Sequence, residues 1–339
     1  MASIEDVARL AKVSASTASR VVRNQAHVRP EIRERVMAAV AELNYLPNAM
    51  ARALKSSRSG LVALITTDIT SPFFTQVARG AEEAARKVGL TLVLGNSEES
   101  ATLETDYLRI MSEHRVDGMV LVPSTDASPA FPNGHGASYP IVFLDRSVAK
   151  YRGDVVRCDT RTGIRELCEH LIAIGHRRIA IVGGKPDVAT WDERIEGCRK
   201  ALEAAGLALP DEMIVNGDYQ TGSGVAAVKT LAERGPLPDI IIAANAQVSI
   251  GVLNELAARG LRVPVDIGVA AVDDPLPNAA FWPRLTVVEQ PGYAMGKQAV
   301  ELLIARLGDA TLPYRHITFE ASLRVGTSCG ELAGILPKS

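Results

Sequence analysis

The sequence predicts a mixed α/β protein that begins with a separate all-α unit. From Gly60 onward, short apolar runs alternate with longer amphipathic stretches, which is typical of parallel β-sheets covered by helices. Residues 1–55 instead show only helical periodicity, and the polar segment Ser56–Gly60 separates the two parts. A chain of 339 residues is also long enough for two or three domains.

Residues 3–22 predict two short helices joined by a tight turn. One face of the first helix is apolar and consists of Ile4, Val7, Ala8 and Ala11. Ser14 is a natural N-cap for the second helix. The second helix turns its own apolar residues back toward the first, and these are Ala18, Val21 and Val22.

The opposite face of the second helix carries small residues, hydroxyls and one arginine. Its members are Ala15, Ser16, Thr17, Ser19 and Arg20. Such a surface can approach base edges closely in the DNA major groove. An ordinary helical hairpin with a polar face is the alternative.

A third helix is predicted to begin at Pro30, because proline is tolerated at the first helical position. Its apolar stripe consists of Ile32, Val36, Val40 and Leu43. The helix ends at the segment Asn44–Pro47, and a short helix-prone piece, Asn48–Lys55, follows it.

The run from Ile4 to Leu54 resembles the headpiece of the lactose-repressor (LacI) family of bacterial transcription regulators. The residues that carry the resemblance are Val13-Ser14, Thr17, Ser19-Arg20-Val21, Arg33-Glu34-Arg35-Val36, Leu43-Asn44-Tyr45 and Pro47-Asn48. The resemblance continues through the rest of the chain. It implies a helix-turn-helix DNA-binding headpiece in residues 1–47, a hinge helix and linker in 48–60, and an effector-binding and dimerisation domain in 61–339.

The resemblance also implies that two headpieces read a pseudo-palindromic operator in double-stranded DNA. The hinge helices are expected to form on DNA, with Leu54 of each subunit inserted into the minor groove. The tail after Cys329 is too short for a tetramerising coiled coil, so a homodimer is expected. The expected DNA contacts are Ser14, Ala15, Ser16, Thr17, Ser19, Arg20, Asn24, His27, Tyr45, Asn48, Arg52 and Leu54.

The alternating pattern after Gly60 places each element of the larger part. Strands are predicted at 61–67, 91–95, 118–122, 141–144, 155–158, 179–182, 214–216, 240–243, 269–272, 285–288 and 316–319. Helices are predicted at 74–88, 103–114, 163–174, 194–205, 224–233, 249–258 and 294–306. The segment 124–139 is rich in Pro, Gly, Ser and Ala, which predicts a loop where the family usually has a helix.

For this part, the resemblance implies a periplasmic-binding-protein-like domain of two Rossmann-like lobes. Lobe 1 would contain about 61–158 and 289–319, and lobe 2 about 159–288 and 320–339. A ligand is expected in the cleft between the lobes, because ligands of open α/β sheets bind at the carboxyl ends of the strands.

Polar and aromatic residues lie at several predicted strand ends and helix starts. Positions matching ligand contacts in ribose-type sugar-binding proteins and sugar-responsive family members, together with one neighbouring tryptophan, are Ser71, Phe73, Phe74, Asp145, Arg146, Trp191, Arg194, Tyr219, Asn245, Asp273 and Gln290. Carboxylates, amides and arginine bond sugar hydroxyls, and aromatic rings cover the C–H face of the sugar. Taken singly, each residue has a structural alternative, such as a local ion pair between Asp145 and Arg146. Together they favour a monosaccharide such as a pentose.

Some positions depart from the family pattern. The usual Asn-Asp pair is Asn245-Ala246, which removes one carboxylate near the pocket. Lys12 stands at the usual turn glycine, and Arg29 at the usual serine cap of the third helix. Purine-responsive relatives carry an arginine just before the Thr190 region, where this chain has Val188, and this disfavours a purine.

Charge is distributed unevenly along the chain. The whole chain has 37 Lys+Arg and 39 Asp+Glu; residues 1–60 hold ten and five of these, which leaves 27 and 34 for the remainder. The first part therefore has a net charge of +5 and the rest −7, which supports phosphate binding at one end.

The remaining sequence signals point away from membranes, metals and catalysis. We find no signal peptide and no apolar run of the roughly 20 residues needed to span a bilayer, so a cytoplasmic protein is expected. The four cysteines lie far apart, which predicts reduced core residues. Neither a metal site nor a cofactor is expected, and no nucleophile elbow or dinucleotide loop supports an enzyme.

The sequence therefore predicts a DNA-binding regulator, a repressor of a sugar-utilisation operon whose effector is a small sugar. A corepressor-dependent regulator of a non-sugar metabolite such as a nucleoside remains an alternative. A transport-type sugar-binding protein would share the larger part, but the first sixty residues argue against it.

Overall fold

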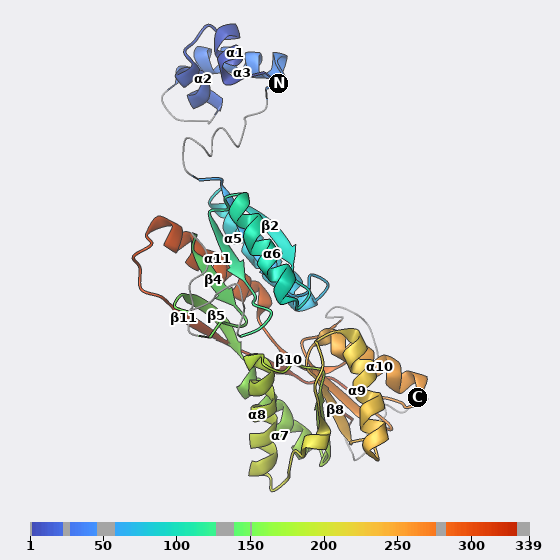
Figure 1. Cartoon of the computed structure of the whole chain (residues 1–339). Helices are drawn as coiled ribbons and strands as arrows, with labels where there is room; N and C mark the ends of the chain where they lie inside the picture. Colours follow the sequence, from blue (N-terminus) through green and yellow to red (C-terminus); the bar gives the residue numbers. More distant parts are fainter. Residues whose placement is uncertain are drawn as a thin grey trace. The chain divides into compact units, whose positions relative to one another are not determined.

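The computed structural model describes residues 2–22, 28–45, 58–126, 139–149, 151–275 and 283–330. The chain divides into two compact units, Met1–Ser59 and Gly60–Ser339 (Figure 1). Several predictions lie outside the described residues. These are the DNA contacts Asn24, His27, Asn48, Arg52 and Leu54, most of the expected loop within 124–139, and the tail after 330.

The smaller unit contains the three predicted helices. They are α1 (Ile4–Leu10), α2 (Ala15–Val22) and α3 (Pro30–Glu42). Their core is formed by the apolar residues that the periodicity selected, with Val7, Ala18 and Val36 essentially inaccessible to solvent. Small core residues allow the helices to pack closely, which explains how so short a unit can exclude water.

The turn between α1 and α2 contains one residue with strained backbone and is stabilised by an arginine of α3. Lys12 has φ +52°, the left-handed region that explains why the family usually has glycine there. Arg35 of α3 donates from Nη2 to the carbonyls of Ala11 and Lys12, at 2.7 and 3.2 Å. The Ser14 hydroxyl accepts from the Thr17 amide at 3.2 Å, so Ser14 caps α2 as predicted.

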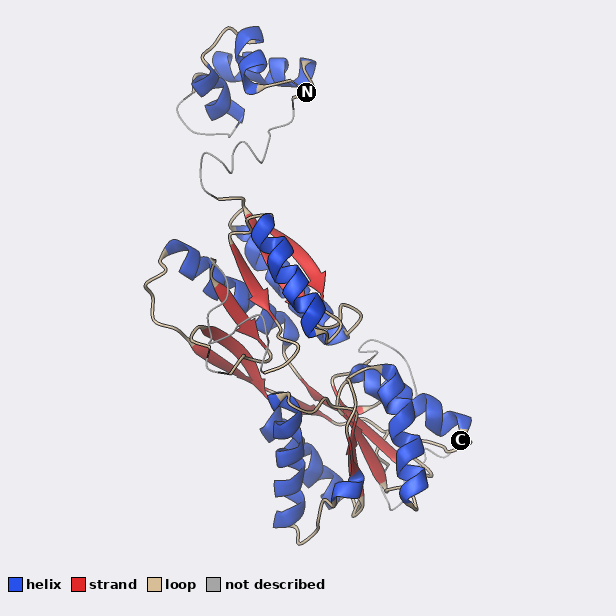
Figure 2. Ribbon diagram, in the orientation of Figure 1, coloured by secondary structure: helices blue, strands red, loops and turns tan. Residues whose placement is uncertain are grey.

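In the larger unit, the first sheet has six parallel strands in the order β11-β5-β4-β3-β1-β2. These are β1 (Leu61–Thr66), β2 (Thr91–Asn96), β3 (Gly118–Leu121), β4 (Ile141–Leu144), β5 (Asp154–Asp159) and β11 (His316–Glu320). Its helices are α5 (Pro72–Lys87), α6 (Ala101–Glu113) and α11 (Gly292–Gly308). α5 and α11 pack on one face and α6 on the other (Figure 2). We call this half lobe 1.

The second sheet also has six strands, in the order β12-β10-β9-β8-β6-β7. These are β6 (Ile179–Val182), β7 (Ile214–Val215), β8 (Ile240–Ala243), β9 (Gly268–Val272), β10 (Thr286–Glu289) and β12 (Ser322–Arg324). The helices α7 (Thr160–Ala173) and α8 (Ala189–Ala204) cover one face, and α9 (Thr221–Arg234) and α10 (Ala246–Ala258) the other. We call this half lobe 2.

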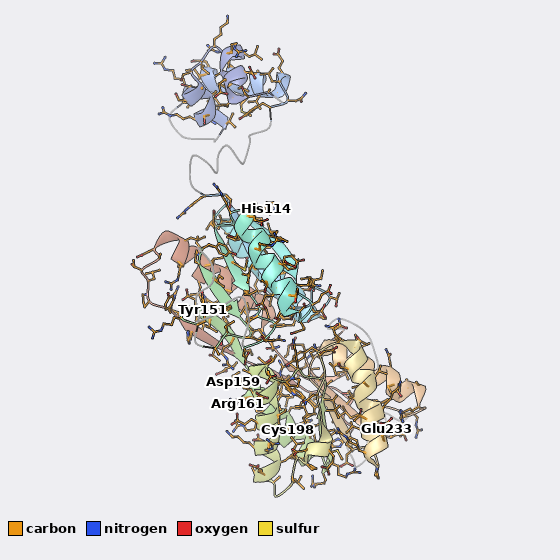
Figure 3. All side chains as sticks on the ribbon, in the orientation of Figure 1. His114, Tyr151, Asp159, Arg161, Cys198 and Glu233 are labelled. Carbon is orange, nitrogen blue, oxygen red and sulfur yellow. The ribbon has the colours of Figure 1, made fainter. Side chains whose placement is uncertain are left out.

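The chain passes between the two sheets three times. It leaves lobe 1 where β5 ends and α7 begins, a junction at which Figure 3 labels Asp159 and Arg161. It returns between β10 and α11, and crosses again between β11 and β12. Asp159 caps α7 by accepting the Thr162 amide at 3.1 Å. Both sheets therefore belong to one continuous unit, and the fold is the predicted α/β class with two parallel-sheet lobes.

The expected elements are present, with two systematic differences. Most helices of the larger unit begin earlier than predicted, α8 by five residues, because a single helical turn is too short to show apolar periodicity. The short strand β12 was not predicted; it pairs antiparallel with β10 at the sheet edge, where a three-residue strand leaves almost no pattern. None of the described helices is long and apolar enough to cross a membrane.

Candidate functional site

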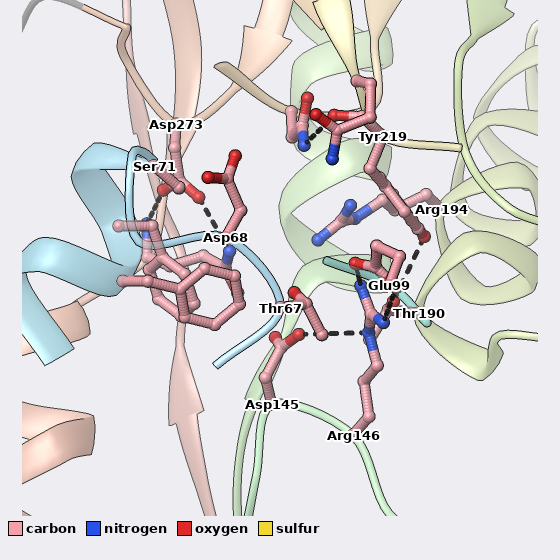
Figure 4. Close-up of a pocket in the computed structure, with 15 residues that line it drawn as sticks. Thr67, Asp68, Ser71, Glu99, Asp145, Arg146, Thr190, Arg194, Tyr219 and Asp273 are labelled. Carbon is pink, nitrogen blue, oxygen red and sulfur yellow. Dashed lines mark hydrogen bonds and ion pairs between the residues drawn. The ribbon is translucent and has the colours of Figure 1, made fainter. Parts of the chain in front are cut away.

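A polar cleft lies at the carboxyl ends of the strands, with lining residues from both lobes (Figure 4). Ten of the eleven predicted ligand-binding residues line it: Ser71, Phe73, Phe74, Asp145, Arg146, Arg194, Tyr219, Asn245, Asp273 and Gln290. Five lining residues were not predicted: Thr67, Asp68, Glu99, Thr190 and Gln220. The cleft therefore confirms that most of the chosen residues converge, while their role in binding stays a prediction.

Four of the lining residues have left-handed backbone. Their φ values are +56° at Glu99, +66° at Asp145, +66° at Tyr219 and +59° at Asp273. None is glycine, so each conformation costs about 1–3 kcal/mol and persists only where the surroundings enforce it. Asp145 and Asp273 directly follow β4 and β9, so the turn after each strand directs a carboxylate into the cleft.

The most extensive charge pairing in the cleft joins Arg146 to Glu99. The Arg146 Nη1 and Nη2 atoms donate to the two Glu99 carboxylate oxygens at 2.7 and 2.8 Å. Both side chains are buried, with 4% and 7% of their surface exposed. The Arg146 guanidinium also lies 5.0 Å from the centre of the Tyr219 ring. Burial alone would lower the pKa of Arg146, but Glu99 outweighs it and the pKa is raised.

Asp273 is held by the residue that follows β10. It accepts from the Gln290 amide at 3.0 Å and from the Gln290 side chain at 2.8 Å. Burial raises the pKa of Asp273 to about 6, although these two hydrogen bonds act to lower it. Burial also raises the pKa of Asp145, against the lowering effect of Arg146 and Arg194.

Several buried polar atoms of the cleft have no hydrogen-bond partner within the described ranges. They include Thr67 Oγ1, Arg194 Nε and Gln290 Oε1. Buried polar atoms normally have partners, since an unsatisfied one costs about 1–3 kcal/mol. This donor and acceptor set matches a ligand that carries both donors and acceptors, such as a polyhydroxy compound.

Hydrogen bonds between the lobes close the cleft. Lys185, after β6, donates to the carbonyls of Glu99 and Ser124 at 2.8 and 3.3 Å. Asp126 of lobe 1 accepts the Ala189 amide at 2.9 Å, which satisfies the first turn of α8. The Gln247 amide donates to the Thr70 hydroxyl at 2.8 Å. These contacts come from loops and from the first turns of α8 and α10.

Trp191 is the one predicted ligand-binding residue that does not line the cleft. Its side chain is 1% exposed, belongs to the core under α8 and donates to Asn216 at 2.9 Å instead of lining the cleft. Because α8 begins at Ala189, Thr190 and Arg194 are four residues apart on one helical face, and that face lines the cleft. Had the sequence analysis begun this helix at Ala189, it would have predicted Thr190 as a cleft residue in place of Trp191.

Asn245 has a structural task as well as a place in the cleft. Its Oδ1 accepts the Val248 amide at 2.8 Å and caps α10, and its Nδ2 donates to the Tyr219 carbonyl at 2.9 Å. Ala246 begins α10 and is buried, so the missing carboxylate of the family pair leaves a small apolar residue there.

The outer face of α2 is the second candidate site. Ser14, Ala15, Ser16 and Arg20 are exposed, and Thr17 and Ser19 are half-buried. The Ser14 hydroxyl lies 2.9 Å from that of Ser16 and 2.8 Å from that of Thr17. Tyr45, the remaining predicted DNA contact in the described part, is half-buried and packs against the core of the small unit. Within the described ranges, no group of three His, Cys, Asp or Glu is placed to hold a metal ion.

Comparisons with known proteins match both units. A family model for "Bacterial regulatory proteins, lacI family" matches residues 3–48, and one for "Periplasmic binding protein-like domain" matches residues 168–329. The "Ribose operon repressor" of Bacillus subtilis is 35% identical over 304 residues, 90% of this chain and 91% of that protein. The "HTH-type transcriptional repressor PurR" of Photobacterium profundum is 32% identical over 333 residues, 98% and 100% of the two chains.

The chain belongs to the LacI family of bacterial regulatory proteins. It is a DNA-binding transcriptional repressor of that family, and its relatives are repressors rather than enzymes. The lac repressor dimer bound to operator and the anti-inducer ONPF has a TM-score of 0.83 at 26% identity, covering 97% of this chain and 99% of that one. The regulator CelR in complex with cellobiose has a TM-score of 0.73 at 31% identity, covering 97% and 100%.

The raised pKa of Asp273 predicts a pH-dependent stability. An unfolded aspartate has a pKa of about 3.9, so between about pH 4 and 6 the unfolded chain loses this proton first. The contribution of Asp273 to the free energy of unfolding therefore falls as pH rises through this window. The free energy of unfolding of Asp273→Asn, minus that of wild type, should therefore rise by about 3 kcal/mol as the pH is raised from 4 to 7.

Urea unfolding of the full chain at several pH values measures this difference. Asp68→Asn is the matched control for the same change at a half-exposed position of the cleft. A difference between Asp273→Asn and wild type that stays constant with pH would contradict the assignment.

Proposed function

We propose that the chain represses a sugar-utilisation operon as a homodimer on a pseudo-palindromic operator, and that a monosaccharide in the cleft controls operator affinity. The observation that carries this proposal is the cleft itself. Buried carboxylates, guanidinium groups and unpartnered polar atoms converge there beside two phenylalanine rings. This combination suits a ligand with many hydroxyls and an apolar C–H face.

The aromatic side of the cleft supports a sugar ring of limited size. Phe73 and Phe74 begin α5, with ring centroids 4.9 Å apart and planes tilted by 59°. Both rings are less than 10% exposed, so they form a rigid wall of the cleft. The relatives named ribose operon repressor and the CelR–cellobiose complex support a saccharide effector.

A nucleoside or purine-type effector is the second candidate, because several relatives of similar identity are named PurR. The position where purine-responsive members carry arginine is Val188 in this chain. Val188 is fully buried at the N-cap of α8, and it does not line the cleft. The absence of that arginine favours the sugar over the purine.

On DNA, the proposal assigns recognition to the exposed face of α2. The small side chains of Ala15 and Ser16 allow the backbone to approach base edges, and Arg20 can donate in a fork to guanine. The hinge segment 48–60, with Leu54 as a minor-groove wedge, and the contacts at Asn24, His27, Tyr45, Asn48 and Arg52 complete the proposed DNA interface.

A ligand screen tests the effector assignment. Thermal unfolding of the full chain is measured with pentoses, hexoses, nucleosides and purine bases. A ligand that binds only the native state stabilises it by about 2.7 kcal/mol at a hundredfold excess over its dissociation constant. We expect a shift with one monosaccharide and its loss in Asp273→Ala. A shift with purines or nucleosides alone would overturn the sugar assignment and leave DNA binding intact.

Arg20→Ala tests the DNA assignment. Binding is measured to an operator selected from random duplexes and to random DNA. If Arg20 reads a guanine, the substitution should cost about 1–3 kcal/mol on the operator and much less on random DNA. Arg9→Ala is the matched control, since Arg9 is an exposed arginine of α1 that pairs with Asp6. Equal losses on both DNAs would make Arg20 a phosphate contact.

A further inference from the structure

Glu99 is a cleft residue that no sequence pattern selected. It follows β2 in a loop where Glu98 and Glu99 both have left-handed backbone, with φ +52° and +56°. Glu98 is exposed, whereas the Glu99 side chain is buried and lines the cleft. Lys185 of lobe 2 holds the Glu99 carbonyl at 2.8 Å. The loop therefore places this one carboxylate in the cleft and the adjacent one in solvent.

The Glu99 carboxylate occupies the anion-binding side of Arg146. Both terminal nitrogens of the guanidinium donate to it, which is the two-point geometry that arginine uses for carboxylates and phosphates (Figure 4). Nη1 also donates to the Pro123 carbonyl at 3.3 Å, and Nε faces Asp145 Oδ2 at 3.5 Å. Glu99 therefore occupies the edge of Arg146 that carries both terminal nitrogens. A ligand phosphate that approached Nε, which has no hydrogen-bond partner among the described residues, would meet the Asp145 carboxylate.

The charges that line the cleft also disfavour an anionic ligand. Its charged lining side chains are four carboxylates, Asp68, Glu99, Asp145 and Asp273, and two guanidinium groups, Arg146 and Arg194. Arg194 donates from Nη1 to the Ala244 carbonyl at 2.7 Å, and its Nε has no hydrogen-bond partner among the described residues. Lys185 is committed to two carbonyls. An anionic ligand would therefore meet more carboxylates than guanidinium groups, and like charges repel.

We propose that Glu99 sets the charge class of the effector: by holding Arg146, it makes the cleft accept uncharged polyhydroxy ligands and reject phosphorylated or carboxylated ones. This inference rests on the proposed effector site, and it adds the charge of the ligand. Glu99 is a specificity residue, because it acts through Arg146 rather than by bonding the ligand.

The test uses D-ribose, D-ribose 5-phosphate and inorganic phosphate as probes in isothermal titration of the full chain. Glu99→Gln keeps the shape of the side chain but removes its charge. It should bind ribose 5-phosphate about tenfold or more tightly than wild type. Glu98→Gln, with the same loop, backbone conformation and charge change, should bind it no better than wild type. Combining Glu99→Gln with Arg146→Gln should remove the gain.

Glu99→Gly is the second variant, because glycine relieves the left-handed backbone and so favours folding while removing the same carboxylate. Both variants are first checked for native thermal unfolding. The inference is overturned if neither Glu99 variant binds ribose 5-phosphate more tightly than Glu98→Gln does. It is also overturned if wild type binds ribose 5-phosphate as tightly as the Glu99 variants do, or if the gain in affinity persists when Arg146 is also replaced.

The failure of this inference can be told apart from failure of the proposed function. A gain of phosphate binding in Glu99→Gln, with no neutral sugar bound by wild type, supports the role of Glu99 and refutes the sugar effector. A neutral sugar bound by wild type, with no gain in the variants, refutes the role of Glu99 and supports the sugar effector.

Discussion

The arrangement of the cleft depends on left-handed turns after strands. Parallel strands whose residues are buried on both faces can present side chains to a ligand only where they end. At Asp145 and Asp273 the residue after the strand has positive φ, and its carboxylate lies in the cleft. Aspartate adopts this conformation more readily than most residues, but it is still strained. Backbone strain at several lining residues is best explained by ligand binding, which requires their side chains to converge in the cleft.

Burial then determines how the charges behave. Glu99, Asp145 and Asp273 carry buried carboxylates, so these groups must be paired, protonated or bonded by a ligand. Arg146 pairs with Glu99, while burial raises the pKa of Asp273 even with Gln290 beside it. A ligand rich in hydroxyls can satisfy such groups without adding charge. The chemistry of the cleft thus follows from the burial of its charged groups as much as from its residue types.

The sequence predicted the sheets well because their strands are apolar runs bounded by turn residues. It also predicted most of the cleft, because polar residues at the ends of parallel strands meet at one edge. Glu99 was missed because it lies three residues after the end of β2, in a loop, and only the folded structure shows that its side chain meets Arg146. Trp191 was misplaced because the first turn of α8 is too short to show a helical pattern, so the face of the helix could not be assigned.

In the small unit, sequence reasoning succeeded for the core and the cap of α2, which depend on local spacing. The family resemblance identified Lys12 as the residue in place of a glycine, and its left-handed backbone shows why that position is demanding. The contribution of Arg35, which binds the turn from α3, was not visible, because it joins residues more than twenty positions apart.

Ligand in the cleft and operator at the small unit are proposed to bias the same equilibrium. Operator affinity is therefore measured with and without saturating ligand, and ligand affinity with and without operator. Both affinities should change by the same factor, typically about 5- to 150-fold, because coupling between two binding sites is reciprocal. A ligand that binds in the cleft and leaves operator affinity unchanged would contradict this coupling.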